Sequence, residues 1–171
     1  MKIVTNWAVA AALGAALALG ATSARAQVNP REPDPAKWLR QVYALYLRAE
    51  KAPALRAQAS YQLIVKRASK TLDALFKKDE ACEAKNEGIC AIDWDFVIDG
   101  QISELSDIKV GPLVVAGDRG SVTVNFNNSG PNVNVYEFVR ENGQWKVDDV
   151  VTKTGTDAPS SLAALIRDFK S

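Results

Sequence analysis

The sequence predicts an α+β domain, in which N-terminal helices pack on a curved antiparallel β-meander and a C-terminal helix follows. Between residues 34 and 78, apolar residues recur at helical spacing. Between residues 108 and 151, runs rich in β-branched and aromatic residues alternate with turn sequences, and a last helical stripe follows. Helices first, then consecutive strands, then a helix is the element order of an α+β domain.

The first 26 residues have the pattern of a cleavable signal peptide. Lys2 supplies the positive end, and residues 7–19 form an uncharged run rich in Ala and Leu. Ala24-Arg25-Ala26 then gives the small-x-small pattern that precedes cleavage, before Gln27. The apolar run is too short for a membrane span. The sequence therefore predicts a periplasmic protein without a membrane anchor, with an extended leader at 27–33 and a single domain at 34–171.

Charge and composition exclude several function classes. Removing Lys2 and Arg25 from the 21 basic residues leaves 19 against 20 acidic ones, a formal charge of −1. A nearly neutral chain lacks the basic face that nucleic-acid binding needs. The chain contains no histidine, which excludes histidine-based catalysis and histidine-ligated metals. We predict no cofactor and no metal site.

Three helices are expected before the meander. Asp34 as N-cap and Pro35 at the first helical position start an amphipathic helix that runs to about residue 50. Pro53 separates it from a second helix at about 54–68, and a third follows at about 69–78, unless the two form one bent helix. Residues 79–101 form a connector without periodicity.

Four strands and a final helix follow the connector. Turn sequences separate the strands, and Asn142-Gly143 is the strongest hairpin signal, because both central residues of a type I′ turn need positive φ. The helix, at about 160–169, carries an apolar stripe and has Asp157 or Ser160 as its N-cap. The expected strands are 108–115, 121–126, 133–140 and 144–151.

The Asn-Gly turn predicts which residues share a face of the sheet. If Glu141 lies opposite Gln144, then Tyr136 lies opposite Asp149. The more apolar face, expected to meet the helices, carries Tyr136, Phe138, Trp145, Val147, Asp149 and Val151. The other face carries Glu137, Val139, Lys146 and Asp148.

Cys82 and Cys90 enclose seven residues, and in an oxidising compartment two cysteines predict a disulfide. A redox pair or a metal site fits less well, because thiol oxidoreductases use a two-residue spacing and two cysteines without histidine do not complete a zinc site.

Asp93, Asp95 and Asp99 form an acidic cluster. As a calcium loop it lacks the alternating ligands and the closing glutamate. The other interpretation, which we favour, is a connector whose aromatic residues enter the core while its acids cap turns.

Three segments carry a resemblance to a known family. They are the Val42-Tyr43-x-x-Tyr46 helix, the stretch Asp93-Trp94-Asp95-x-x-Ile98-Asp99-Gly100-Gln101, and the tail from Glu141 to Val150. Together they resemble domain-of-unknown-function family 3828, small exported bacterial proteins with a nuclear transport factor two-like cone fold. The resemblance implies a cone-like, cystatin-like roll, with helices in the concave side of the sheet. It implies pairing of two copies through the convex side, and no established reaction.

The expected crevice between helices and sheet supplies candidate pocket residues. A desolvated Asp149 beside Tyr136 would have a raised pKa and could bind a cation or abstract a proton, unless it is simply hydrogen-bonded at the strand end. Aromatic residues at helical spacing on the first helix are more often core than pocket. The candidate ligand-binding residues are Tyr43, Tyr46, Tyr136, Phe138, Trp145 and Asp149.

Three functions remain open. The first, which we favour, is a non-catalytic periplasmic binding or accessory domain that holds a small molecule or a partner in the crevice. The second is an envelope interaction protein, such as an immunity or inhibitor protein, with a protein partner. The third is a small cone-fold enzyme using Asp149, for which we predict no catalytic constellation.

Overall fold

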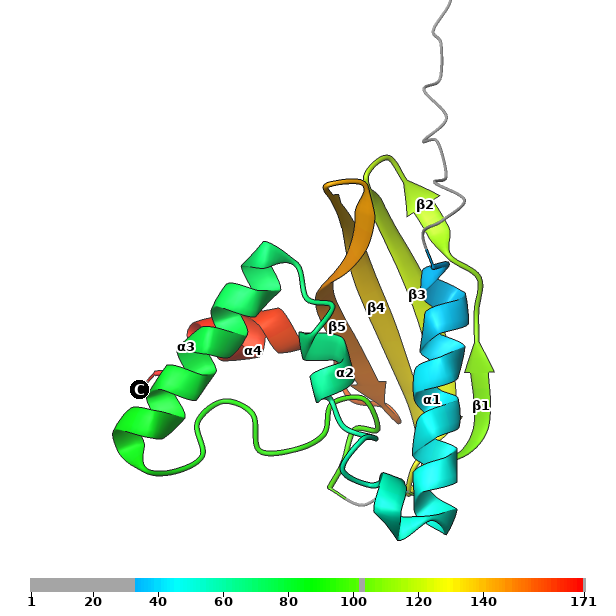
Figure 1. Cartoon of the computed structure of the whole chain (residues 1–171), viewed down its shortest axis with the longest axis horizontal. Coiled ribbons are helices and arrows are strands. Elements are labelled where there is room, and N and C mark those ends of the chain that lie inside the picture. The colour runs from blue at the N-terminus through cyan, green and yellow to red at the C-terminus, as the bar shows by residue number, and fades with distance from the viewer. Residues whose placement is uncertain (1–32, 102–103, 171) are drawn as a thin grey trace, which may run out of the picture.

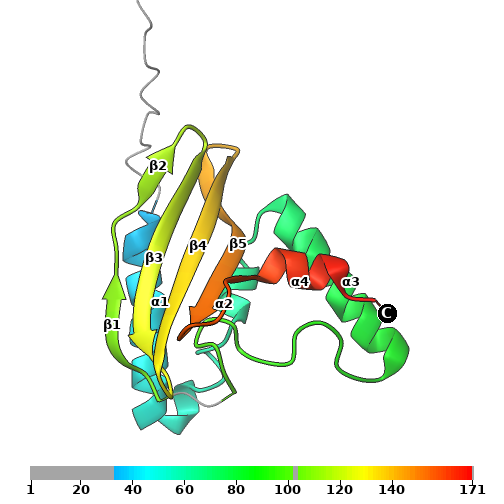
Figure 2. The same cartoon turned by 180° about the vertical axis from the view of Figure 1, so that it is seen from behind.

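The computed structural model describes residues 33–101 and 104–170, so the expected signal peptide and residues 27–32 of the leader lie outside the described part. It confirms the α+β class: N-terminal helices, a six-stranded antiparallel sheet and a C-terminal helix. Helices α1 and α2 lie on one face of the sheet (Figure 1). The opposite face, seen in Figure 2, carries no helix of the described residues.

Helix α1 (Pro35–Lys51) begins as expected, with the Asp34 carboxylate accepting a hydrogen bond from the Ala36 N–H at 2.9 Å. Its buried stripe includes Leu39, Val42, Tyr43 and Tyr46.

The predicted second helix at 54–68 is wrong. The chain forms a short 3₁₀ turn, η1 (Pro53–Leu55), and the four-residue helix α2 (Gln62–Val65). Between them the backbone bonds over three residues, as from the Gln58 N–H to the Leu55 carbonyl at 2.9 Å. Helix propensity in this stretch yields to the tertiary requirement that the chain turn back over the sheet.

Helix α3 (Lys70–Asn86) is longer than the predicted 69–78 and places Cys82 inside the helix rather than in a connector. Most of its residues are strong helix formers, and neither glycine nor proline occurs between Lys70 and Gly88. The Ser69 hydroxyl caps its start by accepting from the Leu72 N–H at 3.0 Å, and Glu87 ends it in the left-handed conformation.

The sheet order is β1-β3-β4-β5-β6, with β2 also paired to β3. The predicted strand 108–115 is two strands, because Gly111-Pro112 interrupts it and proline has no N–H for the ladder. The two-residue β6 was not expected. The strands are β1 (Ser106–Val110), β2 (Val114–Ala116), β3 (Arg119–Asn127), β4 (Pro131–Glu141), β5 (Gln144–Thr154) and β6 (Ser160–Ser161).

The Asn142-Gly143 hairpin has the predicted register only near the turn. Phe138 lies opposite Val147, as expected, but a bulge then places Asp149 opposite Glu137 and Val150 opposite Tyr136. The predicted pairing of Tyr136 with Asp149 is therefore wrong. One extra residue in β5 moves every later side chain to the other face. Val150, not Asp149 or Val151, enters the core, where it is 1% exposed.

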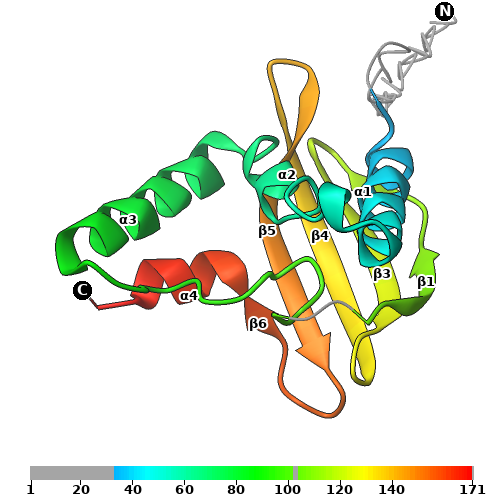
Figure 3. The same ribbon diagram turned by 60° about the horizontal axis from the view of Figure 1, so that its bottom comes forward.

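Helix α4 (Leu162–Asp168) is capped by Ser161, whose hydroxyl accepts from the Ala164 N–H at 3.0 Å, and not by Asp157 or Ser160. It lies beside α3, away from the centre of the sheet (Figure 3). The Lys78 ammonium of α3 donates to the carbonyls of Ile166 at 3.0 Å and Arg167 at 2.8 Å. This lysine caps the C-terminal end of α4 from outside the helix.

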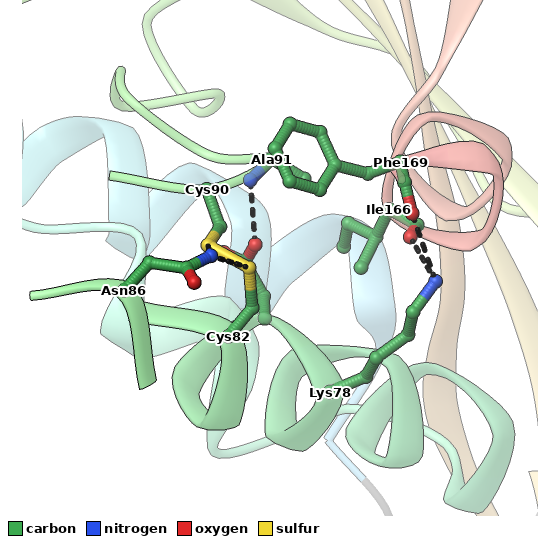
Figure 4. Close-up of a disulfide and its surroundings, with 8 residues drawn as sticks. Lys78, Cys82, Asn86, Cys90, Ala91, Ile166 and Phe169 are labelled. Carbon is green, nitrogen blue, oxygen red and sulfur yellow. Dashed lines mark hydrogen bonds between the residues drawn. A yellow bond between two sulfur atoms is a disulfide. The ribbon is translucent and has the colours of Figure 1, made fainter. Parts of the chain in front are cut away.

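Cys82 and Cys90 form the predicted disulfide, with Cα atoms 6.1 Å apart. Figure 4 shows the Asn86 amide beside the two sulfur atoms, and the Asp79 carboxylate accepts from the Ala91 N–H at 2.7 Å. The bridge therefore ties the end of α3 to the segment that leads back to the sheet. A disulfide is consistent with an oxidising compartment. None of the helices in the two described ranges has the length and apolar character that a bilayer crossing requires.

We expect the double variant Cys82→Ala/Cys90→Ala to lose about 2–3 kcal/mol of unfolding free energy, because the bridge closes a short loop in the unfolded chain. Urea denaturation checks this. A reductant should lower the stability of the parent protein by a similar amount and leave the variant unchanged. Equal stability of the parent, with and without reductant, would contradict the prediction.

Candidate functional site

A cavity of about 370 Å³ lies between the C-terminal half of α1, the turn that precedes α2, and the segment that leads into β1. It is larger than the other two cavities described in this protein, and its volume lies in the range of small-molecule sites. Its polar lining residues are Tyr46, Glu50, Arg56, Asp95 and Gln101, and its apolar ones are Ala49, Ala59 and Ile98.

The centre of this site is a hydrogen bond between a phenol and a carboxylate. The Tyr46 hydroxyl donates to Asp95 Oδ2 at 2.5 Å, and the Val97 N–H donates to the other oxygen at 3.0 Å. Tyr46 comes from the buried stripe of α1 and is 3% exposed. A half-buried carboxylate that accepts two hydrogen bonds has a defined orientation toward the cavity.

Burial changes the acidity of both groups. Desolvation raises the pKa of the Asp95 carboxyl above its ordinary value, and the Tyr46 hydroxyl and the backbone N–H groups of Val97 and Tyr61 act in the opposite direction. Desolvation and the nearby Asp95 charge raise the pKa of Tyr46 far above its ordinary value. Tyr46 is therefore a neutral donor at every physiological pH.

The segment that carries Asp95 is held rigidly. The Asp95 and Gly100 backbones exchange two hydrogen bonds, of 3.1 and 3.2 Å, which close a tight loop. Inside this loop Phe96, Val97 and Ile98 are buried at 4% exposure or less. Side chains of α1 and β4 donate hydrogen bonds to the carbonyls of Phe96 and Val97, and the Asn128 amide, from the turn before β4, donates to the Ile98 carbonyl at 2.7 Å.

A buried polar cluster of three side chains fixes this loop. The Tyr43 hydroxyl donates to the Val97 carbonyl at 2.9 Å and lies 3.0 Å from the Tyr136 hydroxyl. The Asn134 amide donates to the carbonyls of Phe96 at 3.0 Å and Val97 at 3.1 Å. Burial raises the pKa of both tyrosines, so they remain neutral. An irregular backbone inside a core needs such partners, because unpaired carbonyls are costly there.

The rim of the cavity carries both signs of charge. Glu50 Oε1 accepts from the Leu105 N–H at 2.8 Å, which anchors the chain entering β1. The Gln101 amide donates to the Asp93 carbonyl at 3.2 Å. The Arg56 guanidinium is exposed, and it has no ion pair or hydrogen bond with any residue in the described ranges. Carboxylates and a guanidinium without a partner among the described residues therefore line one site.

Of the six candidate pocket residues, Tyr46 lines this cavity. Tyr43, Tyr136 and Phe138 are 0–1% exposed and belong to the core. Trp145 is buried, with the Arg140 guanidinium 4.3 Å from its ring centroid.

Asp149 lies at the start of α4 instead of beside Tyr136. Its carboxylate accepts hydrogen bonds from the Ser161 hydroxyl at 2.5 Å and the Ala163 N–H at 2.9 Å. Both contacts satisfy groups at a helix N-terminus, where a negative charge is favourable. The bulge in β5 turns Asp149 toward this position.

The acidic cluster has the arrangement that we favoured, with apolar side chains in the core and acids at turns. Asp95 caps the turn to Val97, and the Thr154 hydroxyl donates to Asp99. Among the described residues, no group of three or more potential metal ligands comes together. Asp95 was seen in the sequence only as part of a cluster, because its pairing with Tyr46 joins residues that are 49 positions apart.

Comparison of the chain with protein-family models, curated proteins and solved structures found no match.

We expect Asp149→Ala to lower the unfolding free energy by about 1–2 kcal/mol, because it leaves donors at the start of α4 unpaired. Urea denaturation is the measurement. Asp168→Ala, at the other end of the same helix, is the matched control, and we expect it to have almost no effect or to stabilise slightly. Equal losses in the two variants would contradict the capping role.

Asp95 makes a pH-dependent contribution to stability with a defined sign. Because its pKa is raised in the folded protein, the folded state binds the proton more tightly, and this contribution is lost as the pH rises from the ordinary carboxyl range through the raised pKa. In Asp95→Asn this decline should be absent from urea unfolding curves measured across the acid range.

Tyr46→Phe serves as the companion variant. It keeps the ring but removes the donor that lowers the pKa of Asp95. We expect it to cost about 1–3 kcal/mol when Asp95 is charged, and less in acid. A cost that does not depend on pH would show that the Tyr46–Asp95 bond does not control the charge of Asp95.

Proposed function

We propose that this protein is an exported, periplasmic, non-catalytic binding domain, and that its ligand is a small molecule carrying an ammonium and a carboxylate group. One observation carries the proposal. A half-buried carboxylate, held by a neutral phenol, and a guanidinium that has no partner among the described residues line the same cavity of about 370 Å³. Asp95 and Glu50 would receive the ammonium group, and Arg56 would receive the carboxylate with its planar donors.

The signal-peptide pattern and the disulfide support export to an oxidising compartment. The resemblance to domain-of-unknown-function family 3828 supports the export route and implies no established reaction. The carboxylate that an enzyme hypothesis would use, Asp149, is engaged by two donors at the start of α4. A non-catalytic role is therefore the simplest proposal for the chain.

Native mass spectrometry and thermal shift assays test the proposal. We expect protein purified gently from periplasm to carry an extra small mass that denaturation releases. We also expect a panel of free amino acids to include compounds that raise the melting temperature in a concentration-dependent manner. Zwitterions should be more effective than the corresponding amines or carboxylic acids alone.

Arg56→Gln is the decisive variant, because Arg56 is exposed and its loss should not disturb folding. We expect it to weaken amino-acid binding by about tenfold or more, the cost of one charged hydrogen-bonded contact. Arg167→Gln, an exposed arginine on α4, should bind like the parent. A bare protein that responds to no zwitterion, or equal binding by the two variants, would refute the proposal.

A further inference from the structure

A second groove, of about 160 Å³, lies between β5, α4 and the segment 94–99. It shares no lining residue with the cavity at Asp95. The two sites use different side chains of the same loop: Asp95 and Ile98 line the larger cavity, whereas Trp94 and Asp99 line the groove. The groove can therefore be considered independently of the proposed amino-acid site.

The wall of the groove follows from the β5 bulge. Beyond the bulge, Val150, Thr152 and Thr154 share one face of the strand, at the period of two that strands impose. The chain then turns at residues 155–159 and returns as β6, and the Asp157 N–H donates to the Thr154 carbonyl at 3.0 Å. This turn brings Asp157 to the rim. A hydrogen bond from the Thr154 hydroxyl to Asp99 links the two walls.

The groove has an apolar floor and a polar edge. Leu162 and Leu165, one turn apart on α4, lie on the floor with buried Phe96. Half-buried Trp94 adds a large aromatic surface. The edge carries two carboxylates, Asp99 and Asp157, and hydroxyl groups of Thr and Ser. The Asp157 carboxylate has no hydrogen-bond or ion-pair partner among residues 33–101 and 104–170.

These features restrict the ligand. The groove has no lysine or arginine in its lining, which disfavours an anion. Its volume is below the ~300 Å³ typical of sites for drug-sized molecules, so one small ring fits better than a larger molecule. The polar edge is rich in acceptors, which match a ligand with several hydroxyl donors. The apolar floor and Trp94 match a ligand whose ring has C–H groups on its faces.

We propose that this groove binds one pyranose ring of a carbohydrate. The ring would lie against Trp94 and the α4 leucines, and its hydroxyl groups would donate to Asp99 and Asp157 and exchange hydrogen bonds with Thr152. Trp94 is the one aromatic side chain in the lining that is not fully buried. An alkylammonium cage, which surrounds a cation with aromatic faces, is therefore less well supported than a sugar.

The test is a titration of the ¹⁵N-labelled protein by NMR with N-acetylglucosamine, glucose and choline as separate probes. For a single sugar ring we expect a dissociation constant on the order of 1 mM, from the binding energy per atom usual for small ligands. Shifts should be confined to the residues of the groove. A β-1,4-linked trisaccharide of N-acetylglucosamine distinguishes the source: tighter binding than the monosaccharide indicates a glycan chain, and equal binding indicates a free sugar.

Asp157→Asn should raise the dissociation constant for the sugar by about tenfold, because a charged acceptor is replaced by a neutral one. Asp168→Asn, an exposed acid on α4 outside the groove, is the matched control and should bind like the parent. Thr152→Val tests the groove a second time, since it removes a hydroxyl with little change of volume. We expect the backbone spectra of the unliganded variants to match that of the parent away from the substituted position, which shows that they fold.

Two results of the titration would overturn the proposal: no sugar-induced shift in the groove at tens of millimolar sugar, about ten times the expected dissociation constant, or shifts that map outside the groove. Equal sugar affinity of Asp157→Asn and Asp168→Asn would also overturn it. So would a response to choline without a response to sugars. None of these results bears on the amino-acid site, because Arg56→Gln tests that site separately.

Discussion

The fold depends on the need to satisfy the backbone of one irregular loop inside the core. Residues 96–98 are buried without belonging to a helix or strand, so the sheet ladder does not pair their carbonyls. The side chains of Tyr43, Asn134 and Asn128 supply the missing donors. These donors come from α1, β4 and the turn before β4, so the same bonds that satisfy the loop join α1 to the sheet.

Both proposed sites follow from this constraint. A loop whose apolar residues point into the core must direct its neighbours outward on either side. On one side Asp95 meets Tyr46 of α1 and the larger cavity. On the other side Asp99 meets Thr154 of β5 and the smaller groove. Because the loop is closed by backbone hydrogen bonds between Asp95 and Gly100, the positions of both acids are set before any ligand arrives.

At the β5 edge of the sheet, polar groups also attach helices α3 and α4 to the sheet. The Val147 backbone exchanges hydrogen bonds with Arg67 and Ser69, just before α3, and β6 pairs with β5 further along. These contacts cover an edge that would otherwise expose unpaired groups. Asp148 accepts from the Ser69 hydroxyl at 2.7 Å, and Asp149 caps α4. Asp148 and Asp149, the adjacent acids at the bulge, thus anchor α3 and α4, respectively. The disulfide joins α3 to the segment that follows it, and Lys78 joins α3 to α4.

Local chemistry in the sequence determined the fold class, the start of α1, the Asn-Gly hairpin and the disulfide, because each depends on residues close together in the chain. Single-residue features, such as Asp34-Pro35 and Gly143, act through their own backbone preferences. Tertiary structure alone decided the bulge in β5, the division of the predicted helix at 54–68 into η1 and α2, and the pairing of Tyr46 with Asp95. A bulge of one residue changes the face of every later side chain and leaves no local pattern in β5. Asp149 thus became a helix cap, and Asp95, an ordinary member of an acidic cluster in the sequence, became the half-buried carboxylate of the cavity of about 370 Å³.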